Sequence, residues 1–159
     1  MSTKQSSDAV IRVATDGYMT AYLKYAHKLV TEESARVVTV TGSGGAIENA
    51  VLAAELIKRS FAGLHQQTTI GVREFQGNKP NTAYSDEAEK PQIRHVPYVE
   101  IKLSFDDILD KTHTGYQAPI DVKLVKTDQQ ELLKSVTLPR HSHGGRRSRV
   151  GAKKQAVEA

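Results

Sequence analysis

The spacing of apolar residues along the chain predicts three strands and two helices before residue 76. A first strand is expected over Val10, Ile11 and Val13. The next apolar residues recur at intervals of three or four, which is typical of one face of a helix. They are Met19, Leu23, Ala26 and Val30. A second strand, rich in β-branched residues, is expected to open at Ala35 and to run to the glycines that follow Thr41.

A glycine-rich turn separates the second strand from the second predicted helix. The turn consists of Gly42, Ser43, Gly44 and Gly45. Beyond it the apolar residues Ile47, Val51, Ala54 and Ile57 predict one helical stripe. Backbone N–H groups at the start of a helix are unpaired and lie at the positive end of its dipole, so the turn suits a phosphate group. The alternative is that three glycines simply permit a tight connection between strand and helix.

Two further strands complete the predicted sheet. In the third, Leu64, Ile70 and Val72 fall on one face, with Gln67, Thr69 and Arg73 opposite. In the fourth, Val99, Ile101, Leu103 and Phe105 alternate with polar residues and Tyr98. Residues 76–92 between them are rich in turn formers, so the two strands should form a long hairpin. The order β-α-β-α-β-β predicts an α/β sandwich, in which two helices pack on a four-stranded mixed sheet.

The apolar periodicity ends soon after Phe105, and this divides the chain. We expect a flexible lead over residues 1–9, one folded domain over 10–120, and a partly ordered extension over 121–138. Within the extension, Leu132, Leu133 and Val136 predict a short helix over 129–136. Residues 139–159 lack apolar periodicity and are expected to form a disordered basic tail.

Charge is concentrated in that tail. The whole chain carries a net charge of +4. Residues 139–159 contain six arginines and lysines and one glutamate, so the rest of the chain is close to neutral. Four arginines of the tail are candidate contacts to a polyanion. They are Arg140, Arg146, Arg147 and Arg149.

Composition narrows the cellular setting. The chain has no cysteine, which excludes disulfides and thiolate chemistry. It has no run of eighteen apolar residues, and its first residues are polar, so we predict neither a membrane span nor a secretory signal. We expect a cytoplasmic protein and leave nuclear residence open.

An enzyme is the alternative from a different functional class. The glycine turn would have to bind a nucleotide, but Ile47 stands where the pattern GxGxxG requires its last glycine, and no Gly-Lys-Ser/Thr follows. Of the six histidines only His141 and His143 lie close together, without a further metal-ligating partner. We therefore predict no catalytic residue, no metal and no cofactor. A structural assembly factor that binds only protein is a third possibility.

Several stretches resemble the Alba superfamily in its eukaryotic branch. The main match is GSGGAIENAVLAAELIKRSFAGLHQQTTIG, a glycine turn followed by an apolar helix and the third strand. The first helix, GYMTAYLKYAHKLV, is similar to the family's tyrosine-containing helix, and RHVPYVEIKLSFDD and GYQAPI resemble its fourth strand and a later segment. The resemblance covers roughly residues 10–120.

This resemblance implies a nucleic-acid-binding protein that prefers RNA, with DNA as the alternative ligand. It implies roles in mRNA storage, stability or translational control. A related possibility is the larger Alba-type protein subunit of ribonuclease P and MRP. It also implies a dimer, homotypic or with another Alba-type protein, formed through the second helix and the third and fourth strands.

Two departures from the archaeal pattern weaken the case for duplex binding. Asp16 and Gly17 stand where archaeal members have lysines, and Ser43 and Gly45 stand where they have arginines. The hairpin loop is not basic either, since its lysines are matched by acidic residues. Fewer cations neutralise fewer phosphates, which predicts weaker duplex binding and a shallower salt dependence.

Single-stranded RNA therefore fits better, because stacking and backbone contacts suffice to bind it. Tyr18 and Tyr22 are candidates for a stacking platform, although they would equally fit the edge of the first helix with their hydroxyls in water. In addition to the tail arginines, the predicted contacts are Arg12, Tyr18, Tyr22, Gly42, Ser43, Gly44, Gly45, Arg73 and Arg94.

Overall fold

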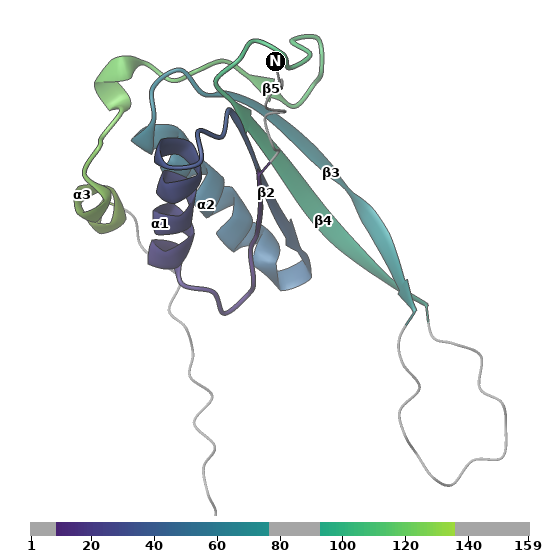
Figure 1. Ribbon diagram of the computed structural model, residues 1–159. Helices are drawn as coiled ribbons and strands as arrows, with labels where there is room; N and C mark the ends of the chain where they lie inside the picture. Colours follow the sequence, from purple (N-terminus) through teal and green to yellow (C-terminus); the bar gives the residue numbers. More distant parts are fainter. Residues whose placement is uncertain (1–8, 77–92, 136–159) are drawn as a thin grey trace, which may run out of the picture.

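A mixed five-stranded sheet organises the chain in a computed structural model that describes residues 9–76 and 93–135. The strands are β1 (Ala9–Arg12), β2 (Val37–Ser43), β3 (His65–Gln76), β4 (Ile93–Ser104) and β5 (Tyr116–Gln117). They lie in the order β1-β2-β4-β3-β5, with β1 parallel to β2 and the other neighbours antiparallel (Figure 1). The predicted α/β architecture and its long hairpin are confirmed, and β5 is a short addition at the edge. The lead, most of the hairpin loop and the basic tail lie outside the described residues.

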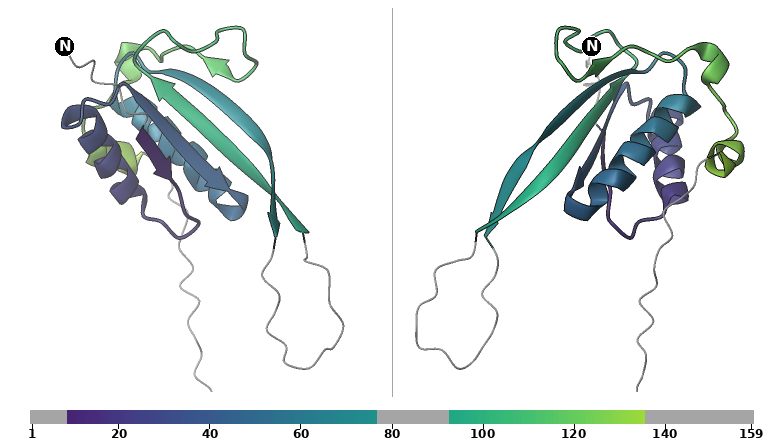
Figure 2. Two further views of the ribbon diagram at one scale, coloured as in Figure 1. Left: turned by 45° about the vertical axis from the view of Figure 1, so that its right-hand side comes forward. Right: turned by 180° about the vertical axis from the view of Figure 1, so that it is seen from behind.

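Helices α1 (Met19–Thr31) and α2 (Ile47–Ser60) lie on one face of the sheet (Figure 2). In α1 the predicted stripe is buried at Met19, Leu23 and Ala26, and Leu29 rather than Val30 completes it. The chain then turns at Ser34, which has a φ of 54°. The Ala35 N–H donates a hydrogen bond to the Leu29 carbonyl, so β2 starts at Val37 rather than at Ala35.

The buried face of α2 differs from the predicted stripe. Ala54 and Ile57 are buried as expected, but Val51 is 44% exposed. Alanines at positions 50 and 53 take its place against the core. A small residue gives a weak signal in an apolar pattern, yet it permits the helix to approach the sheet closely.

The glycine turn is shorter than predicted, because Gly42 and Ser43 are the last residues of β2. A single 3₁₀ turn, η1 (Gly44–Ala46), then leads into α2. The three glycines have different physical roles. A Cβ at Gly42 would lie 2.7 Å from both the Ala46 carbonyl oxygen and the Ala50 Cβ, so this glycine is required for packing. Gly44 has a φ of 55°, whereas a Cβ at Gly45 would make only an ordinary contact with Thr15 at 3.4 Å.

The hairpin of β3 and β4 extends beyond the helices as an arm (Figures 1 and 2). Its register pairs His65 with Ser104 at the base and Gln76 with Ile93 at the outer end. At the base the helix-facing side chains of β4 are buried, and they are Val99, Ile101 and Leu103. Farther out, Ile70 and Val72 occupy the same face of β3 but are 78% and 62% exposed. The predicted alternation is correct for these strands. The helices are too short, however, to cover the outer half of the helix-facing side of the hairpin.

The segment after β4 returns to the sheet and to α2. The Thr68 N–H donates a hydrogen bond of 2.9 Å to the Gly115 carbonyl, which places β5 along the outer edge of β3. A short 3₁₀ turn, η2 (Val122–Leu124), follows, and then α3 (Gln129–Lys134), which buries Leu132 against the core. The helix predicted over 129–136 is therefore present, and Val136 lies outside the described residues.

The packing role of Gly42 can be tested within the turn itself. We expect Gly42→Ala to lower the free energy of unfolding by about 1–3 kcal/mol, because the new methyl group meets backbone and a buried alanine. Gly45→Ala should change it by less than about 0.5 kcal/mol, since the site has ordinary van der Waals space. Urea denaturation of both variants measures the difference. Equal losses would show that packing against α2 is not what Gly42 provides.

Candidate nucleic-acid interface

A groove opens where β1 and β2 end, between the loop after β1 and the arm. Its lining comes from β1, the loop at residues 13–16, the end of β2, the last residue of η1, and β3. The polar and aromatic side chains that line it are Arg12, Thr15, Asp16, Thr41, Ser43, Arg73 and Phe75. The structure thus brings four of the predicted contact residues, Arg12, Gly42, Ser43 and Arg73, into the lining of one groove.

The charge of the groove is modestly positive. Arg12 and Arg73 face one acidic residue, Asp16, so the lining offers two cations and one anion. By strand register, Arg94 opposite Phe75 adds a third cation beside the groove, and Glu100 opposite Thr41 adds a second anion. Such a surface attracts a phosphate chain without the dense charge that grips a duplex.

Arg73 is held in place by an aromatic ring. Its guanidinium carbon lies 4.1 Å from the centroid of the Tyr98 ring, in a cation–π contact across the two strands of the arm. Gly71 makes room for this ring, because a Cβ there would lie 2.8 Å from the Tyr98 Cε1. Gly71, Arg73 and Tyr98 therefore form one unit on the face of the arm that is turned away from the helices.

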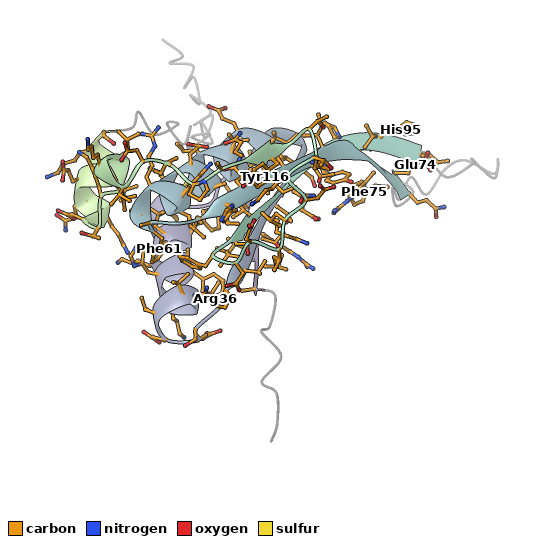
Figure 3. All side chains as sticks on the ribbon, turned by 90° about the horizontal axis from the view of Figure 1, so that it is seen from above. Arg36, Phe61, Glu74, Phe75, His95 and Tyr116 are labelled. Atoms are coloured by element: carbon orange, nitrogen blue, oxygen red, sulfur yellow. The ribbon has the colours of Figure 1, made fainter. Side chains whose placement is uncertain are left out.

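Phe75 continues the same face toward the end of the arm. It is two residues beyond Arg73 on β3 and 48% exposed, and it lines the groove. Figure 3 shows Phe75 near Glu74 and His95 and far from Arg36 and Phe61 at the other end of the molecule. Neither Phe75 nor Tyr98 is among the contacts predicted from the sequence. The alternation of side chains along the strands places both residues on the face away from the core. Two aromatic residues on such a face could have indicated a binding surface.

Tyr22 has a structural role in the wall of the groove. Its hydroxyl accepts a hydrogen bond of 2.9 Å from the Ala14 N–H, and a Cβ at Gly17 would fall only 1.7 Å from the hydroxyl oxygen. The ring thus fixes the loop after β1, which gives no support to its predicted use as a stacking platform. Tyr18 is exposed at the start of α1, and its contact with nucleic acid stays a prediction.

Asn49 anchors the same loop from the other helix. Its side-chain amide donates hydrogen bonds to the carbonyls of Ala14 and Thr15, at 3.3 and 3.0 Å. Asn49 itself is buried in the first turn of α2. The sequence shows Asn49 at the start of an apolar helix, but it does not show what the amide binds, because its partners lie more than thirty positions away. Both helices therefore hold the loop that carries Asp16 into the groove.

The phosphate contact predicted for the glycine turn remains a prediction. Ser43 adopts an extended conformation before η1, and its side chain makes no capping hydrogen bond. Gly44 lies beside Val96 of the arm. A Cβ at Gly44 would lie 3.5 Å from the Val96 Cγ1. The predicted tail contacts, Arg140, Arg146, Arg147 and Arg149, lie outside the described residues.

A separate aromatic cluster lies at the opposite end of the molecule, where Arg36, Phe61 and Phe105 line a second pocket. Phe61 packs against His27 and Phe105, with ring centroids 4.5 and 6.0 Å apart. Arg36 lies over Phe105 and forms an ion pair of 2.5 Å with Asp106. This hydrogen bond lowers the pKa of the Asp106 carboxyl, and burial lowers the pKa of His27. Because its cation is already paired with Asp106, we do not assign the cluster to the nucleic-acid interface.

Within residues 9–76 and 93–135, no group of three or more histidine, cysteine or acidic side chains is arranged to hold a metal ion. In the same residues, no helix has the length and apolar character needed to cross a membrane.

The Tyr22 hydroxyl offers a direct test of how the groove wall is fixed. Tyr22→Phe should lower the free energy of unfolding by about 0.5–1.5 kcal/mol, because the Ala14 N–H loses its partner. Tyr25→Phe on the same helix is the matched control and should leave stability unchanged. Chemical denaturation measures both. Two variants of equal stability would mean that the hydrogen bond contributes nothing to the loop.

Comparison with known proteins gives a consistent result. A family model described as Alba matches residues 9–74. The chain is 35% identical over 120 residues to "DNA/RNA-binding protein ALBA1" of Plasmodium falciparum, which covers 73% of this chain and 46% of that protein. It is 30% identical over 166 residues to "DNA/RNA-binding protein ALBA2" of the same organism, covering 81% of this chain and 79% of that protein.

A second group of relatives has a different name. "Ribonuclease P protein subunit p25" of Rattus norvegicus is 31% identical over 118 residues, covering 69% of this chain and 59% of that protein. This chain therefore spans about half the length of ALBA1 and of p25. Among solved structures, "Alba from Thermoplasma volcanium" matches with a TM-score of 0.44 and 18% identity, over 60% of this chain and 98% of that one.

Proposed function

Because this chain belongs to the Alba family, we propose that it is a nucleic-acid-binding protein whose groove takes single-stranded RNA. The observation that carries the proposal is the convergence of Arg12 and Arg73 with an exposed aromatic ring, Phe75, on one open surface. Cations beside an exposed ring are the combination that single-stranded nucleic acid requires. The names of the Plasmodium relatives, DNA/RNA-binding proteins, support the same class of ligand.

RNA in single-stranded form is preferred for a reason of charge. The groove offers Arg12 and Arg73, with Arg94 beside it, and Asp16 offsets part of that charge. A duplex bound mainly through its phosphates would need more cations on this surface. A single strand also exposes its base faces, and so gains from an aromatic side chain that a duplex does not reach. DNA remains the alternative ligand for the same groove.

In the cell, we propose a role in the storage, stability or translational control of mRNA, together with a cytoplasmic location. The match to p25 favours a second candidate, a protein subunit of a ribonuclease P/MRP-type ribonucleoprotein. Crosslinking the protein to RNA in cells and sequencing the attached RNA separates the two. Messenger RNA supports the first role, and a single abundant structured RNA supports the second.

We further propose that the protein dimerises through the outer half of its arm and through α2. Ile70 and Val72 are largely exposed on the helix-facing side of the arm, and Ile93 continues that side by register. Val51 of α2 adds exposed apolar surface. Burial of these residues against another chain removes apolar area from water. A second copy or another Alba-type protein is the expected partner.

Ser43 tests whether nucleic acid binds in the groove. We expect Ser43→Glu to weaken binding of a single-stranded RNA by about tenfold, because it places a negative charge where the phosphate chain should lie. Gln130→Glu, on the exposed side of α3, adds the same charge elsewhere and should bind like the parent. Fluorescence anisotropy at fixed salt measures both affinities. A Ser43→Glu protein that melts normally and keeps its affinity would move the binding site away from β2.

The dimer is tested on the two faces of β3. Ile70→Glu should shift the protein from dimer to monomer in sedimentation velocity at micromolar concentration, since it buries a charge in the proposed interface. Thr69→Lys, one residue earlier, places a charge on the opposite face, across the strand pair from Glu100, and should leave the dimer intact. A parent protein that is monomeric, both alone and with Alba-type partners, would contradict the dimer itself.

A further inference from the structure

We propose that an unpaired nucleobase stacks in the groove on the ring of Phe75 and on the outer side of the Arg73 guanidinium. This inference deepens the proposed function and rests on it. It names the contact that selects single-stranded over duplex nucleic acid, and it assigns the stacking to the arm rather than to the tyrosines of α1.

The geometry of the arm supports a preformed site. Tyr98 already covers one side of the Arg73 guanidinium at 4.1 Å, and this contact is possible because Gly71 has no side chain. A guanidinium backed by a ring is planar and held in place, so its other side can receive a second flat group. Phe75 lies two residues farther along the same strand face, half-exposed and without a ring contact of its own among the described residues.

The charges around Phe75 indicate what kind of flat group belongs there. Arg94 lies across the strand pair from Phe75, and Arg12 lines the same groove as Phe75. A ligand that presents a flat ring and a negative chain satisfies both features, and an unpaired nucleotide is such a ligand. In a duplex both faces of each base are covered by its neighbours, so stacking on Phe75 would first require unstacking.

The absence of tryptophan from the chain makes the contact directly observable. Phe75→Trp introduces one fluorophore at the proposed site, and Tyr25→Trp introduces one on the exposed side of α1 as a control. We expect an oligoadenylate of about twelve nucleotides, near the upper site size of one binding domain, to quench the indole fluorescence of the Phe75→Trp variant strongly and that of the control weakly. An oligonucleotide of equal length with abasic sugars should bind without quenching, because it keeps the phosphates and lacks the rings.

Two further variants measure how much stacking contributes to the binding affinity. Phe75→Leu keeps an apolar side chain but removes the aromatic face, and Arg73→Lys keeps the charge but removes the planar guanidinium. We expect each to weaken binding of the oligoadenylate by roughly 5- to 100-fold, the range for one stacked base. Binding of the abasic strand should change by less than about twofold, since the charge of the groove is preserved.

The outcomes separate this inference from the proposed function. Suppose that the parent binds the oligoadenylate, that Phe75→Leu binds it equally well, and that the fluorescence of Phe75→Trp is not quenched. Stacking on the arm is then wrong, and the proposed function stands. If Phe75→Leu weakens the intact and abasic strands equally, the side chain only supports the fold of the groove, which also overturns stacking. If the folded parent binds no oligonucleotide, the proposed function itself fails, and the inference fails with it.

Discussion

The close approach of α2 to the end of β2 is the contact on which the rest of the structure depends. At Gly42 there is no room for a side chain, because the Ala46 carbonyl of η1 and the Ala50 side chain of α2 lie against the strand. This contact fixes the position of Asn49, whose amide then holds the carbonyls of Ala14 and Thr15. The wall of the groove thus follows from helix packing. A buried amide without these partners would cost about 1–3 kcal/mol, so the loop and the helix stabilise each other.

The arm has two faces with opposite chemistry, and the limited length of the helices is the reason. On the helix side, burial at Val99 and Ile101 gives way to exposed residues beyond the N-terminal end of α2. On the other side, the strands carry Gly71, Arg73 and Phe75 opposite Tyr98, Val96 and Arg94. Since side chains alternate along a strand, one hairpin can offer an apolar surface to a protein and a cationic, aromatic surface to a nucleic acid. Two proposed interactions can therefore use the arm without competing for one face.

Much of the fold could be predicted from the sequence, because the spacing of apolar residues indicates which segments form strands and which form helices. The order of strands and helices and the long hairpin required only alternation at β4 and a helical stripe at α1. The prediction was wrong where a small residue did the packing: Val51 was placed in the core that Ala50 and Ala53 occupy. It was incomplete for the site, because the contact between Arg73 and Tyr98 depends on strand register across a loop. Arg12 and Arg73 could be selected as cations on the predicted strands, and Ser43 could be selected as part of the glycine turn.

The chemistry of the groove implies a division between attraction and selection. Contacts to phosphate act at every nucleotide alike and weaken as salt rises, so they bring nucleic acid to the surface without choosing its form. With Asp16 beside Arg12 and Arg73, this attraction is limited on the folded domain. An aromatic ring adds a contact that salt does not screen and that only an exposed base can make. A groove with few cations and an exposed ring should therefore lose affinity for duplexes faster than for single strands as ionic strength rises. Sparse charge on this surface thus contributes to selectivity, because it leaves stacking as the larger share of the binding free energy.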